Sequence, residues 1–199
     1  MKLGVIGGTF NPIHNGHLYI ASEALRLLKL DKIIFIPAGN PPHKQEEKIT
    51  DAIIRSQMVK AAVGDYSNFE VSDYEVNKRT YSYTYETLEY LKGLYKEAEI
   101  FFITGADCLI NLYSWRKVPE ILELCSFVVL SRSGYSKEEL EMQKHKVLGD
   151  FKGNIILLDL EELNISSTDI RNRIKNKQEY KFFVPEKVYG LIEALNLYK

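Results

Sequence analysis

The sequence is poor in several features that mark particular classes of protein. It has two cysteines, Cys108 and Cys125, and they lack the close spacing of a redox or zinc motif. It has no run of the ~20 apolar residues that a membrane span needs, and the apolar run at its N-terminus is too short for a signal peptide. These absences argue against a disulfide scaffold and a membrane protein, and they predict a cytoplasmic protein with reduced thiols.

An excess of charge of one sign is also missing. Lysine and arginine number 26, aspartate and glutamate number 27, and the net charge is −1. Nucleic-acid partners are therefore not expected, because they usually require a strongly basic surface. Small anionic ligands remain open, since a few local cations suffice for them. The 199 residues, 45 % of them hydrophobic, predict a single domain over 1–199 with a small helical part from about residue 165.

Five short apolar runs alternate with helical patterns along the chain. Most of the runs are continuous, which is typical of strands buried on both faces of a parallel sheet. They cover residues 2–6, 32–36, 99–103, 127–130 and 154–158. Helices are expected over residues 17–29, 51–63, 84–95, 136–148, 168–175 and 186–197. The alternation predicts an α/β fold that is doubly wound, with a mainly parallel sheet and helices on both faces. Such folds bind ligands beyond the carboxyl ends of their strands.

The stretch GGTFNPIHNGH, at 7–17, joins the first expected strand to the first expected helix. Gly7 and Gly8 let a ligand approach the backbone closely, and the helix behind them offers free N–H groups and a positive dipole end. His14 and His17 are spaced so that at a helix entry they point to one side and can donate hydrogen bonds to phosphate. A metal site would need a third ligand, and a nucleophile relay would need a serine or cysteine. Phosphate binding is therefore favoured over both, and over a solvated glycine turn.

The stretch ISSTDIR, at 165–171, follows a strand and opens a helix. Ser166 and Asp169 have the spacing of a capping box, so a well-capped helix is one interpretation. The other is an anion site, in which hydroxyls, N–H groups and Arg171 bind phosphate.

The stretch NPPHK, at 40–44, lies in a long loop over 38–50. Its two prolines present His43 and Lys44 at low entropic cost, so phosphate contact is plausible. A solvated charged loop is the alternative.

Two segments near the middle of the chain also have two interpretations each. In TGADCLINLYSW, at 104–115, Asp107 falls just past a strand, where an acidic side chain can bind ribose hydroxyls. Trp115, the only tryptophan, is either a core residue or a platform for stacking a ring. KRTYSYTYETL, at 78–88, is basic and aromatic, and its tyrosines either pack as amphipathic side chains or contact a ligand.

Taken together, these motifs resemble the nucleotidylyltransferase superfamily. GGTFNPIHNGH is similar to its (H/T)xGH signature, and ISSTDIR is similar to its second ATP-binding motif. NPPHK, SYTYETL, GAD and the tryptophan after it narrow the resemblance to the bacterial nicotinate-nucleotide adenylyltransferases, over essentially the whole chain. The resemblance implies a Rossmann-like nucleotidyltransferase fold. It also implies transfer of AMP from ATP to nicotinate mononucleotide, which yields deamido-NAD and pyrophosphate in NAD biosynthesis and needs Mg²⁺.

The resemblance also implies roles for particular residues. The expected catalytic residues are His14, His17, Lys44 and Arg171, with His17 nearest the reacting α-phosphate. The residues expected to bind ATP are Gly8, Thr9, Phe10, Gly105, Asp107, Arg132, Ile165, Ser166, Ser167 and Arg171. Those expected to bind the mononucleotide are Asn40, His43, Lys44, Tyr83, Thr84 and Trp115. No residue is implied as a metal ligand.

One position departs from the family pattern. Asn11 stands where many members have aspartate, so contacts to phosphate or metal are expected to differ slightly there. Both histidines are retained, and the assignment is not affected.

Other functions share the same motifs. The phosphate acceptor could be nicotinamide mononucleotide or phosphopantetheine, and a non-catalytic nucleotide-binding module would also keep both phosphate motifs. The expected partners are small molecules, and the sequence leaves homo-oligomerisation open.

Overall fold

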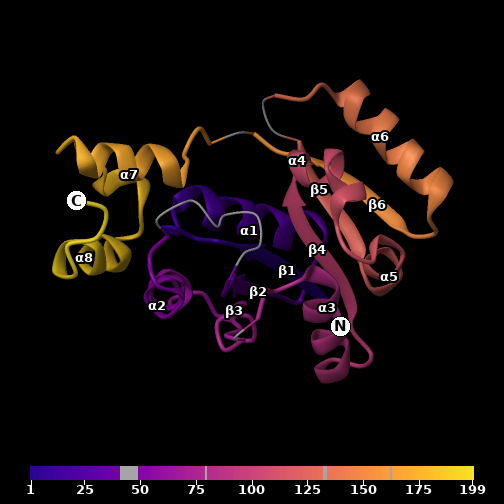
Figure 1. Ribbon diagram of the computed structural model, residues 1–199, viewed down its shortest axis with the longest axis horizontal. Coiled ribbons are helices and arrows are strands. Elements are labelled where there is room, and N and C mark those ends of the chain that lie inside the picture. The colour runs from indigo at the N-terminus through magenta and orange to yellow at the C-terminus, as the bar shows by residue number, and fades with distance from the viewer. Residues whose placement is uncertain (41–48, 79, 132–133, 162) are drawn as a thin grey trace. The chain divides into compact units, whose positions relative to one another are not determined.

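A computed structural model describes residues 1–40, 49–78, 80–131, 134–161 and 163–199. His43, Lys44 and Arg132 lie outside the described residues. Within them, no helix is both long and apolar enough to cross a membrane. The elements are β1 (Lys2–Gly8), α1 (Asn15–Leu27), β2 (Lys32–Pro37), α2 (Ala52–Val63), β3 (Phe69–Val71), α3 (Thr84–Leu94), β4 (Glu99–Gly105), α4 (Ala106–Ile110), a 3₁₀ turn (Leu112–Ser114), α5 (Val118–Leu124), β5 (Ser126–Ser131), α6 (Lys137–Asp150), β6 (Asn154–Asp159), α7 (Ser167–Lys175), a second 3₁₀ turn (Lys181–Phe183) and α8 (Glu186–Ala194) (Figure 1).

The strands form one six-stranded sheet in the order β3-β2-β1-β4-β5-β6. β1 pairs with β4, β4 with β5, and β5 with β6, all in parallel, with Ile6 opposite Ile103 and Ile103 opposite Val128. The strand order reverses between β1 and β4, which makes the carboxyl ends of these two strands the expected place for a ligand. The predicted doubly wound α/β fold is confirmed.

One compact unit comprises Met1–Gly7, Ala24–Ile33 and Tyr83–Glu162. Its core is the central sheet, where Phe127 and Val128 are fully buried. Its helices contact each other in two pairs, α3 with α5 and α4 with α6. This unit holds the carboxyl end of β4, where a glycine and an aspartate were expected to bind the nucleotide.

The other compact unit comprises Gly8–Glu23, Ile34–Ser82 and Leu163–Lys199. In it, α2 contacts both β3 and α8, and Phe35 packs against Phe69 with ring centroids 5.5 Å apart. The C-terminal helices are thus packed onto an earlier part of the chain. The expected count of one domain over 1–199 stays a prediction.

All five expected strands and all six expected helices are present, with ends that differ by a few residues. β3, α4, α5 and the two 3₁₀ turns were not expected, because each is too short to show a periodic apolar pattern. The last helix ends at Ala194, three residues before the expected end, and Asn196 and Tyr198 then adopt positive φ angles of 50° and 65°. Those two left-handed residues turn the C-terminal tail back, and the position of Tyr198 follows from that turn.

Candidate active site

The loop that joins β1 to α1 is packed around the side chain of Phe10. Phe10 is 3 % exposed and has a φ of 47°, a left-handed conformation that is unfavourable for a bulky residue. Its ring meets the His17 ring edge-on at 5.0 Å and the Phe35 ring at 6.0 Å. A Cβ on Gly8 would lie 3.0 Å from the Phe10 ring. Glycine at position 8 therefore avoids a tight contact with the Phe10 ring, whether or not a ligand also approaches it.

The two histidines lie together at the start of α1, as their spacing predicted. Their rings are stacked, with centroids 3.7 Å apart and an interplanar angle of 29°. Nδ1 of His17 accepts a hydrogen bond of 3.2 Å from the backbone N–H of His14, so in the neutral His17 ring the proton is on Nε2. A Cβ on Gly16 would lie 3.0 Å from Nδ1 of His14, so this glycine leaves room for the stack. The arrangement assigns Nε2 of His17 as a hydrogen-bond donor.

Arg55, in α2, is a buried cation that sequence reasoning missed. It is 1 % exposed, and burial lowers the pKa of its guanidinium. Its Nη1 donates to the Thr9 carbonyl at 2.6 Å, Nη2 donates to the carbonyls of Ala38 at 2.7 Å and Gly39 at 3.2 Å, and Nε donates to Thr50 at 2.8 Å. One side chain thus joins the β1–α1 loop to both ends of the loop after β2. The only signal in the sequence is an arginine within an otherwise largely apolar helix, AIIRSQMVKAAV.

The second motif binds the same loop from α7. The Ser166 hydroxyl caps α7 by accepting from the backbone N–H of Asp169 at 3.1 Å, as capping-box spacing predicted. The Ser167 hydroxyl donates to the carbonyl of residue 12 at 2.8 Å, and Nη1 of Arg171 donates to the Asn11 carbonyl at 2.9 Å. The structure therefore brings together the two motifs that were predicted to bind phosphate, although 155 residues separate Pro12 from Ser167.

The side chain of Asn11 lies inside the protein. It is 4 % exposed, and its Oδ1 accepts from the Tyr198 hydroxyl at 2.9 Å and from the backbone N–H of Thr50 at 3.4 Å. The side chain at the position that departs from the family pattern is therefore engaged with the protein itself. Sequence reasoning did not foresee this partner near the C-terminus.

Three more of the predicted residues lie near these loops. Ile165 is half-buried, and a Cβ on Gly16 would lie 3.6 Å from its Cβ. Thr9 is half-buried, and its carbonyl is bound by Arg55. Asn40 is exposed and is the last described residue before position 49.

In the unit that contains β4, two predicted residues share one strand end. β4 ends at Gly105, and Asp107 is exposed in the first turn of α4. A Cβ on Gly105 would lie 2.6 Å from Oδ1 of Asp107, so the glycine makes room for this carboxylate. The carboxylate is placed at the carboxyl edge of the sheet, as the sequence predicted.

The same unit contains the aromatic residues that were predicted to bind the mononucleotide. Tyr83 precedes the first residue of α3, Thr84, and the guanidinium carbon of Arg116 lies 4.5 Å from the Tyr83 ring. Trp115 is half-buried and meets the rings of Phe102 and Phe127 edge-on at 6.2 and 5.9 Å. Trp115 is thus anchored to the core while part of it stays accessible, and its stacking on a ligand ring stays a prediction. Arg116 was not predicted as a site residue.

Metal-binding side chains do not gather in the part of the chain that the structure describes. No group of three or more histidine, cysteine, aspartate or glutamate side chains there is placed to hold an ion. A nucleotide-bound Mg²⁺ needs only one or two protein ligands, because the phosphates and water supply the rest.

The fold and the two joined motifs define a nucleotidyltransferase of the Rossmann-like α/β type. Residues 5–173 match the family described as cytidylyltransferase-like. The chain is 54 % identical over 198 residues to the probable nicotinate-nucleotide adenylyltransferase of Clostridium botulinum (strain Eklund 17B / Type B), which covers 100 % of this chain and 98 % of that protein. It is 52 % identical over 198 residues to the protein of the same name from Clostridium novyi (strain NT), with 100 % and 99 % coverage. The chain belongs to the nicotinate-nucleotide adenylyltransferase family.

A solved structure shares the fold at low sequence identity. It is the Plasmodium falciparum nicotinic acid mononucleotide adenylyltransferase complexed with NaAD, with a TM-score of 0.78 and 19 % identity. The match covers 99 % of this chain and 97 % of that one.

Replacing Arg55 with lysine will destabilise the protein by about 2–4 kcal/mol, because one ammonium cannot reach all the carbonyls that the guanidinium binds, and a buried polar group left unpaired costs ~1–3 kcal/mol. Equilibrium urea unfolding measures the change. Arg173→Lys is the matched control, since Arg173 forms a largely exposed ion pair with Asp169 and its loss should cost ~0–1 kcal/mol. An equal loss of unfolding free energy in both variants would show that Arg55 does not hold the two loops together.

Proposed function

We propose that this protein transfers AMP from ATP to nicotinate mononucleotide, giving deamido-NAD and pyrophosphate. The observation that carries the proposal is the β1–α1 loop, where a stacked histidine pair meets the helix that bears Arg171. Those are the two motifs that were predicted to bind ATP phosphates. The names of relatives that match the chain at 54 % and 52 % identity support the same reaction and the same acceptor.

The proposed reaction needs charge stabilisation more than proton transfer. The attacking group is a phosphate of the mononucleotide, which is already ionised near neutral pH and has no proton to lose at the attacking oxygen. The difficulty is to bring two anions in line, since two unit charges 4 Å apart repel by about 4 kcal/mol at an effective dielectric constant of about 20. Hydrogen-bond donors held in advance around the leaving pyrophosphate would offset this repulsion.

His17 is proposed to act on the α-phosphate. Its Nδ1 already accepts the N–H of His14, so Nε2 is the ring atom that can donate to a phosphate oxygen. His14, Lys44 and Arg171 are proposed to bind the remaining phosphate oxygens. Mg²⁺ would enter with the ATP phosphates and supply positive charge to the leaving pyrophosphate.

The other predicted residues are proposed to bind the two nucleotides. Asp107 would accept hydrogen bonds from the adenosine ribose, and Trp115 and Tyr83 would surround the nicotinate ring. For the remaining contacts we propose Gly8, Thr9, Phe10, Gly105, Arg132, Ile165, Ser166 and Ser167 for ATP, and Asn40, His43, Lys44 and Thr84 for the mononucleotide. We place the reaction in the cytoplasm, where the two cysteines of the sequence would stay reduced.

The protein is expected to release pyrophosphate when it is incubated with ATP, Mg²⁺ and nicotinate mononucleotide. Parallel reactions with nicotinamide mononucleotide and with phosphopantetheine measure the choice of acceptor as kcat/KM. Faster turnover of either one would assign a different adenylyltransferase activity. Binding of both nucleotides without pyrophosphate release would indicate a nucleotide-binding module.

Replacing His17 with alanine will lower kcat by about 100-fold or more, the usual cost of losing a preorganised donor at a developing charge. Two further variants separate chemistry from local structure. Asparagine keeps a polar atom near the position of Nδ1, where it can accept the His14 N–H, whereas glutamine places its amide near the position of Nε2. Steady-state rates should show asparagine as impaired as alanine, with glutamine retaining more activity. A kcat for His17→Ala within about threefold of wild type would remove His17 from the mechanism.

Nicotinate mononucleotide is expected to change the fluorescence of Trp115, because stacking of a pyridine ring on the indole alters its emission. The protein has a single tryptophan, so the tryptophan emission comes from Trp115 alone. A titration to saturation, compared with a titration of ATP alone, measures the effect. No change with the mononucleotide would leave Trp115 a packing residue only.

A further inference from the structure

The C-terminal tail reaches the candidate active site through one tyrosine hydroxyl. Tyr198, the residue before the last, donates to Oδ1 of Asn11 at 2.9 Å. Burial raises the pKa of the Tyr198 phenol, so this hydroxyl keeps its proton and remains a donor. The same Asn11 oxygen accepts the Thr50 N–H, and the side chain of Asn11 is almost fully buried. Asn11 thus joins the β1–α1 loop to the C-terminus.

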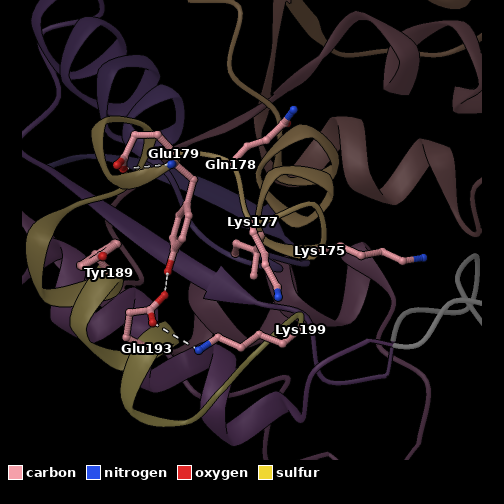
Figure 2. A pocket seen from close by; sticks show the side chains of 9 residues that line it. Lys175, Lys177, Gln178, Glu179, Tyr189, Glu193 and Lys199 are labelled. Atoms are coloured by element: carbon pink, nitrogen blue, oxygen red, sulfur yellow. Dashed lines mark hydrogen bonds and ion pairs between the residues drawn. The ribbon is translucent and has the colours of Figure 1, made fainter.

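The tail that carries Tyr198 is anchored on its far side. Nζ of Lys199 donates to Glu193 at 3.2 Å and to the side chain of Asn196 at 3.0 Å. Glu193 also accepts the Tyr180 hydroxyl at 2.5 Å. Figure 2 shows the contact between Lys199 and Glu193, which both line a cavity of about 480 Å³. The tail is therefore held at Lys199 while Tyr198 binds the loop.

The loop itself is bound at three neighbouring carbonyls. Arg55 binds the carbonyl of Thr9, Arg171 binds that of Asn11, and Ser167 binds that of Pro12. These contacts hold the main chain. Tyr198 instead binds a side chain of the loop, that of Asn11. Asn11 lies three residues before His14, whose backbone N–H orients the His17 ring.

We propose that Tyr198 is a positioning residue, which acts through Asn11 to keep the β1–α1 loop and its two histidines in the geometry that receives the ATP phosphates. The kcat measurements that test this inference rest on the proposed function. A single buried hydrogen bond contributes little to the net stability of a fold. Its effect on catalysis can be larger, because a displacement of ~1 Å in a positioning group can cost up to ~100-fold in rate.

The test compares two tyrosine-to-phenylalanine variants that each lose one hydroxyl bond. Tyr198→Phe is expected to lower kcat about tenfold while KM for nicotinate mononucleotide stays within about twofold. Tyr180→Phe is the matched control, since its hydroxyl binds Oε1 of Glu193 and not the loop, while Lys199 binds Oε2 and keeps its anchor. It should lose a similar amount of thermal stability and keep the wild-type kcat. Equal kcat values in the two variants would overturn the proposal.

A double-mutant cycle tests whether Tyr198 acts through Asn11. Asn11→Ala removes the acceptor, so adding Tyr198→Phe to it should change kcat no further. Independent, multiplicative effects of the two substitutions would contradict the proposed route.

Hydrogen exchange supplies a readout that needs no substrate. The backbone N–H of His14 should exchange faster in Tyr198→Phe than in wild type or Tyr180→Phe. If wild-type protein releases no pyrophosphate, the proposed reaction fails, while this measurement still decides whether Tyr198 orders the loop. Unchanged exchange in Tyr198→Phe would overturn the positioning role.

Discussion

Hydrogen bonding to the carbonyls of the β1–α1 loop is the constraint on which the candidate site depends. The loop leaves the sheet after Gly8, and buried carbonyls require donors from elsewhere in the chain. Arg55 from α2 and Ser167 and Arg171 from α7 supply them. Elements distant in sequence therefore set the shape of a loop whose own residues include a strained Phe10. These contacts therefore also determine where the two histidines at the start of α1 lie.

The same constraint explains why histidine suits the proposed chemistry. An imidazole is short and stiff, and here one nitrogen of His17 is already bound to the main chain. The remaining nitrogen then has a defined direction, which a flexible lysine would not have. A site of this kind stabilises charge by position, which is what attack by an already ionised phosphate requires.

Much of the fold was predictable because its signals are local. Continuous apolar runs located five strands, and the alternation with helices predicted the parallel, doubly wound sheet. The elements that were missed are short, such as β3 with three residues, and so short a segment shows no repeating pattern of apolar residues. In the candidate site, the placement of His14 and His17 on one side and the capping by Ser166 followed from residue spacing, whereas the stacking of the two rings did not.

The contacts that could not be predicted are those between distant parts of the chain. Arg55 stands in a helix where an exposed position was the ordinary expectation, yet it is buried because four carbonyls from two loops surround it. In the sequence, Asn11 was only a small departure from the family pattern. Its hydrogen-bond partner Tyr198 is 187 residues away. Spacing carries no information about such pairs, since they depend on how helices pack.

The sequence by itself determined the class of fold and the family, and it located the two motifs predicted to bind phosphate, because each depends on local patterns of residue type and spacing. Only the tertiary structure decided which side chains hold the β1–α1 loop. Packing of α8 on α2 and the anchoring of the tail at Lys199 determine where the Tyr198 hydroxyl can donate its hydrogen bond. A hydrogen bond needs two groups within about 3 Å of each other, and chain folding alone brings such groups together.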